Sequence, residues 1–198
     1  MKQIIGLTGP TGSGKSSAVS TAEKFGITVI DCDKVVHEVF ATDADCQAAL
    51  CAAFGEDVLE NGDINRKILA QRAFESKDAT ELLNNTVFPF VTYRILKDIE
   101  NAKGNIILLD APTLFESGID EICGSTVAIL ADAQLRKARI INRDNISEEA
   151  ALSRLNAGKN DDFYLENADF VLYNNGEQSS LEAEFNNLLG KLINIGGN

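Results

Sequence analysis

Residues 4–17 read IIGLTGPTGSGKSS, an apolar run that enters a glycine-rich loop and ends in a lysine and two serines. The loop satisfies the pattern G-x-x-x-x-G-K-[ST], whose glycines let the main chain wrap around an anion with its N–H groups pointing inward. Residues 3–7 are typical of a buried strand and residues 16–25 of a helix, which is the context that the pattern requires. The stretch therefore predicts a nucleoside triphosphate site rather than a glycine-rich turn with a surface lysine.

Each polar group of the loop has an expected task. Lys15 reaches the β- and γ-phosphates, Ser16 places its hydroxyl on Mg²⁺, and the following helix presents its positive end to the anion. We expect the nucleotide to contact Gly12, Ser13, Gly14, Lys15, Ser16 and Ser17.

Composition narrows the class of protein. The 198 residues are 44% hydrophobic and 24% charged, which is enough apolar content for the core of one compact domain. The apolar runs fall far below the ~20 residues of a membrane crossing, no signal peptide precedes the loop, and a formal net charge of −12 disfavours an extended nucleic-acid surface. We expect a cytoplasmic protein with small-molecule substrates and without nucleic-acid or membrane partners, as a monomer or small homo-oligomer.

The four cysteines form no CxxC pair and have no histidine cluster beside them. This spacing disfavours a zinc site or a redox motif. We expect reduced, mostly buried thiols at Cys32, Cys46, Cys51 and Cys123.

Five short apolar runs alternate with amphipathic segments along the chain. This alternation predicts an α/β fold in which a five-stranded parallel sheet is flanked by helices. We expect the strands at residues 3–7, 27–31, 105–110, 126–131 and 169–173.

Two long segments differ from this alternation. Residues 44–102 carry a helical pattern only, with a turn at residues 60–63, and predict an inserted α-helical subdomain over the strand ends where such sheets bind ligands. Residues 134–167 are polar, helical and rich in arginine, which is typical of a lid that closes on phosphate. Residues 1–43 and 103–198 would form the nucleotide-binding core of a single domain.

Two aspartates end the second apolar run. Asp31 and Asp33 would lie at the carboxyl edge of the sheet, where a carboxylate can accept a proton from a substrate hydroxyl or hold Mg²⁺. We expect catalysis from Asp33, whereas Asp31 could contact ligand or cap a helix. His37 follows Asp33 by one helical turn and could face the same crevice, although a lone histidine is more often structural.

The third run leads into LLDAPTLFESG at residues 108–118. Asp110 follows four apolar residues, like the strand-end acid that helps to hold Mg²⁺ beside phosphate-binding loops. Glu116 is either a further polar contact or a surface carboxylate.

Arg139 and Arg143 are four residues apart and therefore share one helical face. Two guanidinium groups there could clamp the charge of a transferring phosphoryl group. Ion pairs with nearby acids are the alternative.

Together, these motifs resemble those of the dephospho-CoA kinase family. The family's opening loop, its aspartate pair with a basic residue four positions on, and its D-x-P-x-L-F-E-x-G stretch occur here in order. So do the glycine, arginine and aromatic of its helical insertion, its arginine pair followed by aspartate and SEEA, and its late AD-x-V-x-x-N. The matching positions are 6–16, Asp31, Asp33, His37, Gly62, Arg66, Phe74, Asp110, Pro112, Leu114, Phe115, Glu116, Gly118, Arg139, Arg143, Asp144, 147–150 and 168–174.

The resemblance implies a P-loop kinase fold with an acceptor-binding insertion and a lid. It implies ATP-dependent phosphorylation of the ribose 3′-hydroxyl of dephospho-CoA, the last step of coenzyme A synthesis, with ATP and Mg²⁺ as cofactors. Asp33 would be the catalytic base, and Lys15 and Arg143 the charge clamps.

The same resemblance implies the remaining binding residues. For the nucleotide, it adds Arg139 and Asn174 to the loop. For Mg²⁺, it implies Ser16, Asp33 and Asp110. For the acceptor, it implies Asp31, His37, Arg66, Asp110, Leu114 and Glu116.

Three positions depart from the family pattern and bear on acceptor affinity and lid closure. Phe88 stands where the insertion usually has a histidine, and Gly158 and Tyr164 stand where the lid usually has a glutamine and a basic residue. Two alternative functions therefore stay open: a phosphate-loop kinase for another small acceptor, such as a nucleoside or nucleotide, and an ATP-binding module without catalysis.

Overall fold

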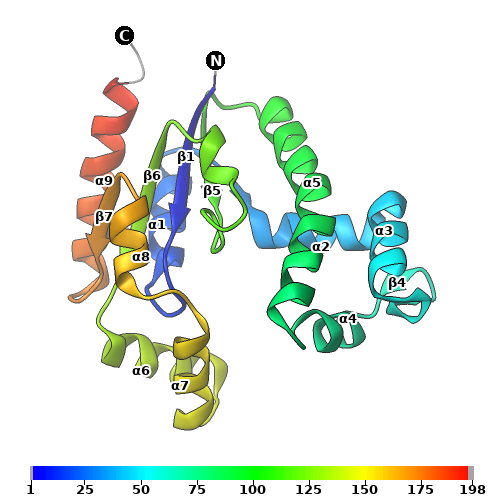
Figure 1. The fold of residues 1–198 in the computed structure, drawn as a ribbon. Coiled ribbons are helices and arrows are strands. Elements are labelled where there is room, and N and C mark those ends of the chain that lie inside the picture. The colour runs from blue at the N-terminus through cyan, green and yellow to red at the C-terminus, as the bar shows by residue number, and fades with distance from the viewer. Residues whose placement is uncertain (1, 196–198) are drawn as a thin grey trace. The chain divides into compact units, whose positions relative to one another are not determined.

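The computed structural model describes residues 2–195, which form two compact units (Figure 1). The first unit joins the residues up to Ile30 with those from Ala102 onward. The second unit runs from Asp31 to Asn101. The division expected at residue 44 falls at the start of helix α3 (Ala44–Phe54), and helix α2 (Cys32–Thr42) before it lies in the second unit.

A five-stranded parallel sheet in the order β2-β5-β1-β6-β7 forms the centre of the first unit. All five expected strands are confirmed, with ends shifted by one residue at most. They are β1 (Gln3–Thr8), β2 (Thr28–Asp31), β5 (Ile106–Asp110), β6 (Ser125–Leu130) and β7 (Phe170–Tyr173).

Alternation along β6 assigns its two faces to different clusters. Val127 and Ile129 belong to a buried cluster with residues of helices α1 (Lys15–Lys24) and α9 (Gln178–Ile195), which pack together on one side of the sheet. Ala128 and Leu130 point to the other side, where Tyr164 of helix α8 (Asp161–Asn167) covers them. The sheet is therefore buried on both faces, as its nearly continuous apolar strands predict.

The expected lid segment consists of helices separated by capped turns. Helix α6 (Ala133–Asp144) is followed by α7 (Glu148–Ala157) and α8. The Ser147 side chain accepts a hydrogen bond from the Ala150 N–H at the start of α7, and the Asn160 side chain accepts one from Phe163 at the start of α8. The remaining short element of the first unit is the 3-10 helix η2 (Ile119–Ile122).

The second unit is helical except for one hairpin, so the expectation of helices only is wrong at that place. Strand β3 (Leu59–Glu60) pairs antiparallel with β4 (Asp63–Ile64). Asn61 and Gly62 between them have φ angles of 54° and 88°, because a tight hairpin turn of this hand needs two positive φ values. Two-residue strands are too short to show alternation in sequence. The other elements are α2, α3, η1 (Glu56–Val58), α4 (Arg66–Ala73) and α5 (Lys77–Asn101).

The cysteines are free thiols, as expected. Cys32, Cys46 and Cys51 are buried and Cys123 is partly buried. Burial raises the pKa of the Cys123 thiol to about 12 and that of Cys46 to about 11. Both thiols are therefore protonated and unreactive near neutral pH.

Within residues 2–195, no helix combines the length and the apolar character that a membrane crossing demands.

Replacement of Phe185, a fully buried ring of α9, tests which core supports the sheet. We expect Phe185→Ala to lower the free energy of unfolding by about 3–5 kcal/mol, because the cavity it leaves lies under the central strands. Phe25→Ala is the matched control, since that ring is 52% exposed and its loss should cost less than about 1 kcal/mol. Urea unfolding measures both, and equal losses would contradict this assignment of the core.

Candidate active site

The loop between β1 and α1 has a main chain that only glycine adopts easily. Gly9, Gly12 and Gly14 have φ angles of 143°, 79° and 95°. A Cβ on Gly9 would lie 2.2 Å from the carbonyl oxygen of Ile129 in the neighbouring strand. The glycines are therefore required both for conformation and for close approach to β6.

The carbonyl groups of this loop receive hydrogen bonds from side chains outside it. Arg136 Nε donates to the carbonyl of Thr11 at 3.1 Å. Arg139 Nη1 donates to the carbonyls of Gly12 and Ser13, both at 3.3 Å, and the Asn174 amide also donates to Ser13, at 2.8 Å. Three side chains thus hold the loop main chain in place from outside.

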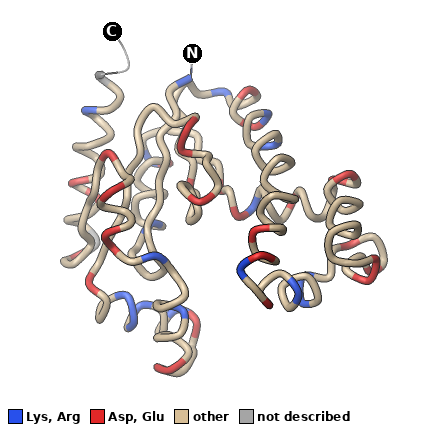
Figure 2. Tube along the Cα trace, in the orientation of Figure 1, with Lys and Arg blue, Asp and Glu red and all other residues tan. Residues whose placement is uncertain are grey.

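These donors come from two elements far along the chain. Arg136 and Arg139 lie on α6, which carries four of the chain's 18 lysines and arginines and shows as a basic segment in Figure 2. Asn174 follows β7, where its N–H donates to the Leu130 carbonyl at 2.8 Å and its side chain is buried. The buried Arg136 also pairs with Asp161 at 3.1 Å.

The first turn of α1 is open to an anion. Its N-cap residue, Gly14, supplies no side-chain hydrogen bond, and no acidic residue lies in the first turn. Lys15 begins the helix and Ser16 is exposed beside it. The buried Ser13 hydroxyl has no hydrogen-bond partner among residues 2–195. N–H groups of a first helical turn and these side chains form the donor set that a polyphosphate requires.

Asp110 lies beside this loop, at the carboxyl end of the sheet. It is the last residue of β5, and the strand register pairs it with Leu7 of β1, just before the loop. The N–H of Ala111 donates to the Leu7 carbonyl at 3.0 Å, and one carboxylate oxygen of Asp110 is buried.

This oxygen chemistry fits Mg²⁺. The Asp110 carboxylate and the Ser16 hydroxyl are hard oxygen donors, and Mg²⁺ usually binds one or two such protein groups together with substrate phosphates and water. In the described part of the chain, no three histidine, cysteine or carboxylate side chains are grouped as an all-protein metal site. The donor set therefore fits a metal that arrives with the nucleotide.

The two arginines expected to form a clamp take different partners. Arg139 binds the loop carbonyls and also the carbonyl of Asn174, at 2.9 Å. Arg143 makes two hydrogen bonds to Asp144, at 2.7 and 2.9 Å, and Arg154 of α7 bonds to the same carboxylate. A paired clamp is thus absent from these contacts, and the alternative of an ion pair describes Arg143. Because the Arg143 side chain is 61% exposed, its guanidinium can leave Asp144 for another partner without a steric barrier.

The acidic and basic residues expected beyond the second strand all lie in the second unit. Asp31 ends β2 and caps α2, since its side chain accepts a hydrogen bond from the Lys34 N–H at 3.0 Å. Asp33 is exposed in the first turn of α2, and His37 is exposed one turn later. Arg66 is the exposed first residue of α4. The capping alternative for Asp31 is therefore observed, while the ligand roles of these residues stay predictions.

Leu114 is withdrawn as an acceptor contact. Its side chain is fully buried and packs so closely against Gly6 of β1 that a Cβ there would lie 2.8 Å from it. Leu114 therefore belongs to the core, whereas Glu116 two residues later is exposed. Tyr164 is also a core residue rather than a ligand-facing lid residue, and burial raises its pKa to about 12.

The role of Arg136 was missed by sequence reasoning. It was one of several cations in the expected lid, and nothing local distinguishes it from Lys137. In the structure, Lys137 pairs with the exposed Glu148, whereas Arg136 is buried against the loop. The rotation of α6 about its axis decides which of the two side chains faces the loop. That rotation depends on how α6 packs.

The chain is similar in sequence and in fold to known proteins. A family described as dephospho-CoA kinase matches residues 3–180. A dephospho-CoA kinase of Idiomarina loihiensis is 33% identical over 189 residues, which cover 95% of this chain and 94% of that protein. A solved dephospho-CoA kinase from Campylobacter jejuni has a TM-score of 0.68 at 27% identity, covering 97% of this chain and 98% of that one. A crystal structure from Thermus thermophilus has a TM-score of 0.82 at 26% identity, covering 96% and 98% of the two chains.

Replacement of Gly14 tests the tight packing of the loop. A Cβ at this position would lie 2.1 Å from the Asn174 amide nitrogen, so Gly14→Ala should break the bond from Asn174 to the Ser13 carbonyl. We expect the Kd for ATP to rise at least about tenfold, because the loop loses a donor that orders it. Gly26→Ala is the control, since it has a similar φ of 75° and no atom within 4 Å. Calorimetric titration with MgATP measures both, and an equal rise would show that backbone strain alone matters.

Proposed function

The chain belongs to the dephospho-CoA kinase family, and we propose that its loop and strand-end residues perform that family's phosphoryl transfer as follows. The reaction is the ATP-dependent phosphorylation of dephospho-CoA to coenzyme A. The family match over residues 3–180, combined with a phosphate-binding loop held by Arg136, Arg139 and Asn174, is the observation that carries this function.

The nucleotide's phosphates would bind the N–H groups at the start of α1 and the Lys15 ammonium. Arg136, Arg139 and Asn174 already hold the loop carbonyls. The loop therefore needs little conformational change to bind the phosphates. Ser16 and Asp110 would hold Mg²⁺, which would supply positive charge beside the β- and γ-phosphates.

Asp33 would act as the general base. It accepts the proton of the ribose 3′-hydroxyl as that oxygen forms a bond to the γ-phosphorus, and the bond from the γ-phosphorus to the bridging oxygen breaks to release ADP. Asp33 is exposed in the first turn of α2, so its carboxylate is accessible to a substrate. His37, Arg66 and Asp31 are proposed to contact the acceptor from the same unit.

Arg143 would exchange its partner during the reaction. It leaves Asp144 for the transferring phosphoryl group, and Arg154 remains to neutralise Asp144. An arginine that holds a carboxylate in two bonds can hold two phosphoryl oxygens in the same way. Charge spread over the transferring group is then neutralised when it is largest.

We infer that the enzyme acts in the cytoplasm on small-molecule substrates. The buried position of Tyr164 supports an intact lid, because this departure from the family pattern lies in the core. The alternative acceptors, a nucleoside or a nucleotide, are decided by incubating the protein with MgATP and each acceptor and weighing the products. We expect a product heavier by one phosphoryl group from dephospho-CoA.

Removal of the proposed base tests its role. Asp33→Ala should lower kcat by roughly 10²- to 10⁴-fold and leave the Kd for ATP nearly unchanged, because the proton acceptor is lost and the loop is intact. Lys15→Ala should weaken ATP binding as well as turnover. Asp45→Ala is the control, since Asp45 occupies the first turn of α3 as Asp33 does in α2. Full turnover by Asp33→Ala would remove the base from this mechanism.

A second pair of variants separates catalysis from ion pairing at Asp144. Arg143→Ala should lower kcat roughly 10²- to 10³-fold, because phosphoryl charge loses its clamp. Arg154→Ala removes the other partner of the same carboxylate and should lower kcat only slightly. Steady-state kinetics with both substrates measure the two effects, and equal losses would assign them to the structure around Asp144.

A further inference from the structure

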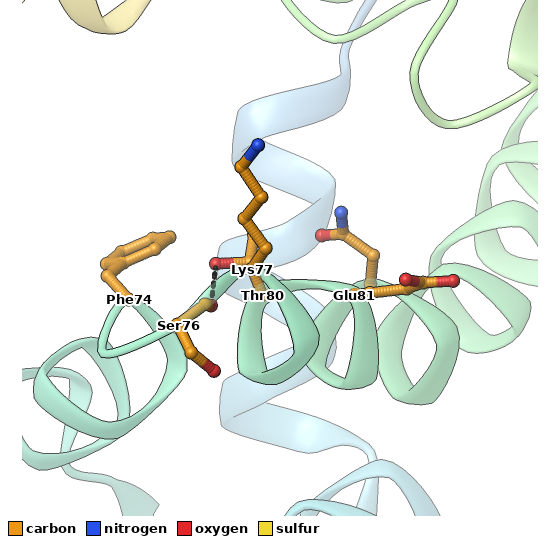
Figure 3. Close-up of a pocket in the computed structure, with 6 residues that line it drawn as sticks. Phe74, Ser76, Lys77, Thr80 and Glu81 are labelled. Carbon is orange, nitrogen blue, oxygen red and sulfur yellow. Dashed lines mark hydrogen bonds between the residues drawn. The ribbon is translucent and has the colours of Figure 1, made fainter.

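The second unit contains an open groove of about 460 Å³ at the start of α5 (Figure 3). Phe74, the C-cap residue of α4, stands at one end with its ring 69% exposed, and Lys77 rises between it and Glu81. The lining residues are Phe74, Ser76, Lys77, Thr80, Glu81 and Asn84. None of the site residues described above lies among them.

The groove runs along one face of helix α5. Lys77, Thr80, Glu81 and Asn84 recur every three to four residues and therefore form one face of α5. Seven residues of helix correspond to about 10 Å of rise, to which Phe74 adds the width of a ring. An extended, flexible ligand fits this shape better than a compact one.

The charges in the groove do not favour phosphate. The Lys77 ammonium is offset by the Glu81 carboxylate, and Asp78 lies in the first turn of α5, where it opposes the positive end of the helix. The lining itself therefore carries one cation and one carboxylate, with Asp78 as a further negative charge in the same helical turn. This charge balance favours a neutral ligand over a diphosphate.

The hydrogen-bonding groups suit amides. Thr80 Oγ1 shares its one hydrogen between the Ala73 carbonyl at 2.8 Å and the Ser76 carbonyl at 3.1 Å, so its lone pairs can accept a hydrogen bond. Ser76 Oγ accepts from the Ala79 N–H at 3.1 Å and keeps its own hydrogen for donation. With the Asn84 amide, the face offers both donors and acceptors along its length.

We propose that this groove binds the pantetheine arm of the acceptor, an inference that rests on the proposed function. The arm is uncharged, flexible and extended, it carries two amide groups, and its geminal dimethyl group needs an apolar surface such as the Phe74 ring. The adenine of the same acceptor is the rival occupant. Among the described residues that line the groove, Phe74 is the one aromatic ring, so a base could stack on one face only.

The experiment compares two acceptors in the full-length protein. One is dephospho-CoA, and the other is the methyl ester of adenosine 5′-diphosphate, which keeps adenine, ribose and diphosphate but lacks the arm. Phe74→Ala should raise the KM for dephospho-CoA about tenfold with kcat unchanged, because an apolar contact is lost, and should leave kcat/KM for the methyl ester unaltered. Phe74→Leu should restore most of the affinity, since an alkyl group needs apolar contact rather than a π-face.

Pantetheine itself supplies an independent readout. Its inhibition constant against dephospho-CoA should rise in Phe74→Ala by the same factor as the KM. Leu96→Ala is the control, because Leu96 is 45% exposed on the same helix and does not line the groove. Unchanged melting temperatures verify that the exposed substitutions leave the fold intact.

The outcomes separate this inference from the function on which it rests. If the unmodified protein does not phosphorylate dephospho-CoA, the proposed function fails. If it does, but Phe74→Ala affects both acceptors equally and Phe74→Leu does not restore affinity, the groove binds adenine and the inference is overturned. No effect on either acceptor, or on inhibition by pantetheine, overturns it as well.

Discussion

The carbonyl groups of the phosphate-binding loop set the central constraint of this structure. A main chain that turns its N–H groups toward an anion directs carbonyls elsewhere, and buried carbonyls need donors. Arg136, Arg139 and Asn174 supply them. The positions of α6 and of the end of β7 therefore follow from a requirement of the loop, and the sheet has to bring both elements to it.

The packing of the sheet meets that requirement. β1 lies in the middle of the five strands, with Ile5 and Leu7 fully buried beneath the loop. On one side of β1, the neighbouring strand β5 ends at Asp110. On the other side lie β6 and then β7, which is followed by Asn174. Asp110, the loop and Asn174 thus share one edge of the sheet because parallel strands end together. The expected base, Asp33, belongs to the second compact unit, so its chemistry depends on an element built around a separate core.

Local sequence patterns predicted most of the secondary structure accurately. The five strands, the helix after the loop, the helices within residues 134–167 and the buried thiols follow from periodicity and spacing over a few residues. The hairpin at β3 and β4 escaped notice because two-residue strands have no period. Leu114 was misassigned because a motif position does not reveal whether its side chain faces ligand or core, and burial against Gly6 decides that.

By itself, the sequence determined the type of chemistry and the phosphate-binding loop. Glycines with positive φ, one lysine and one serine suffice for a phosphate-binding loop, since their effect is local. Only the tertiary structure decided which of several arginines supports that loop: Arg136 and Arg139 bind its carbonyls, whereas Arg143 pairs with Asp144. The loop and α6 are more than a hundred residues apart and come into contact through helix packing. No short stretch of sequence determines that packing geometry.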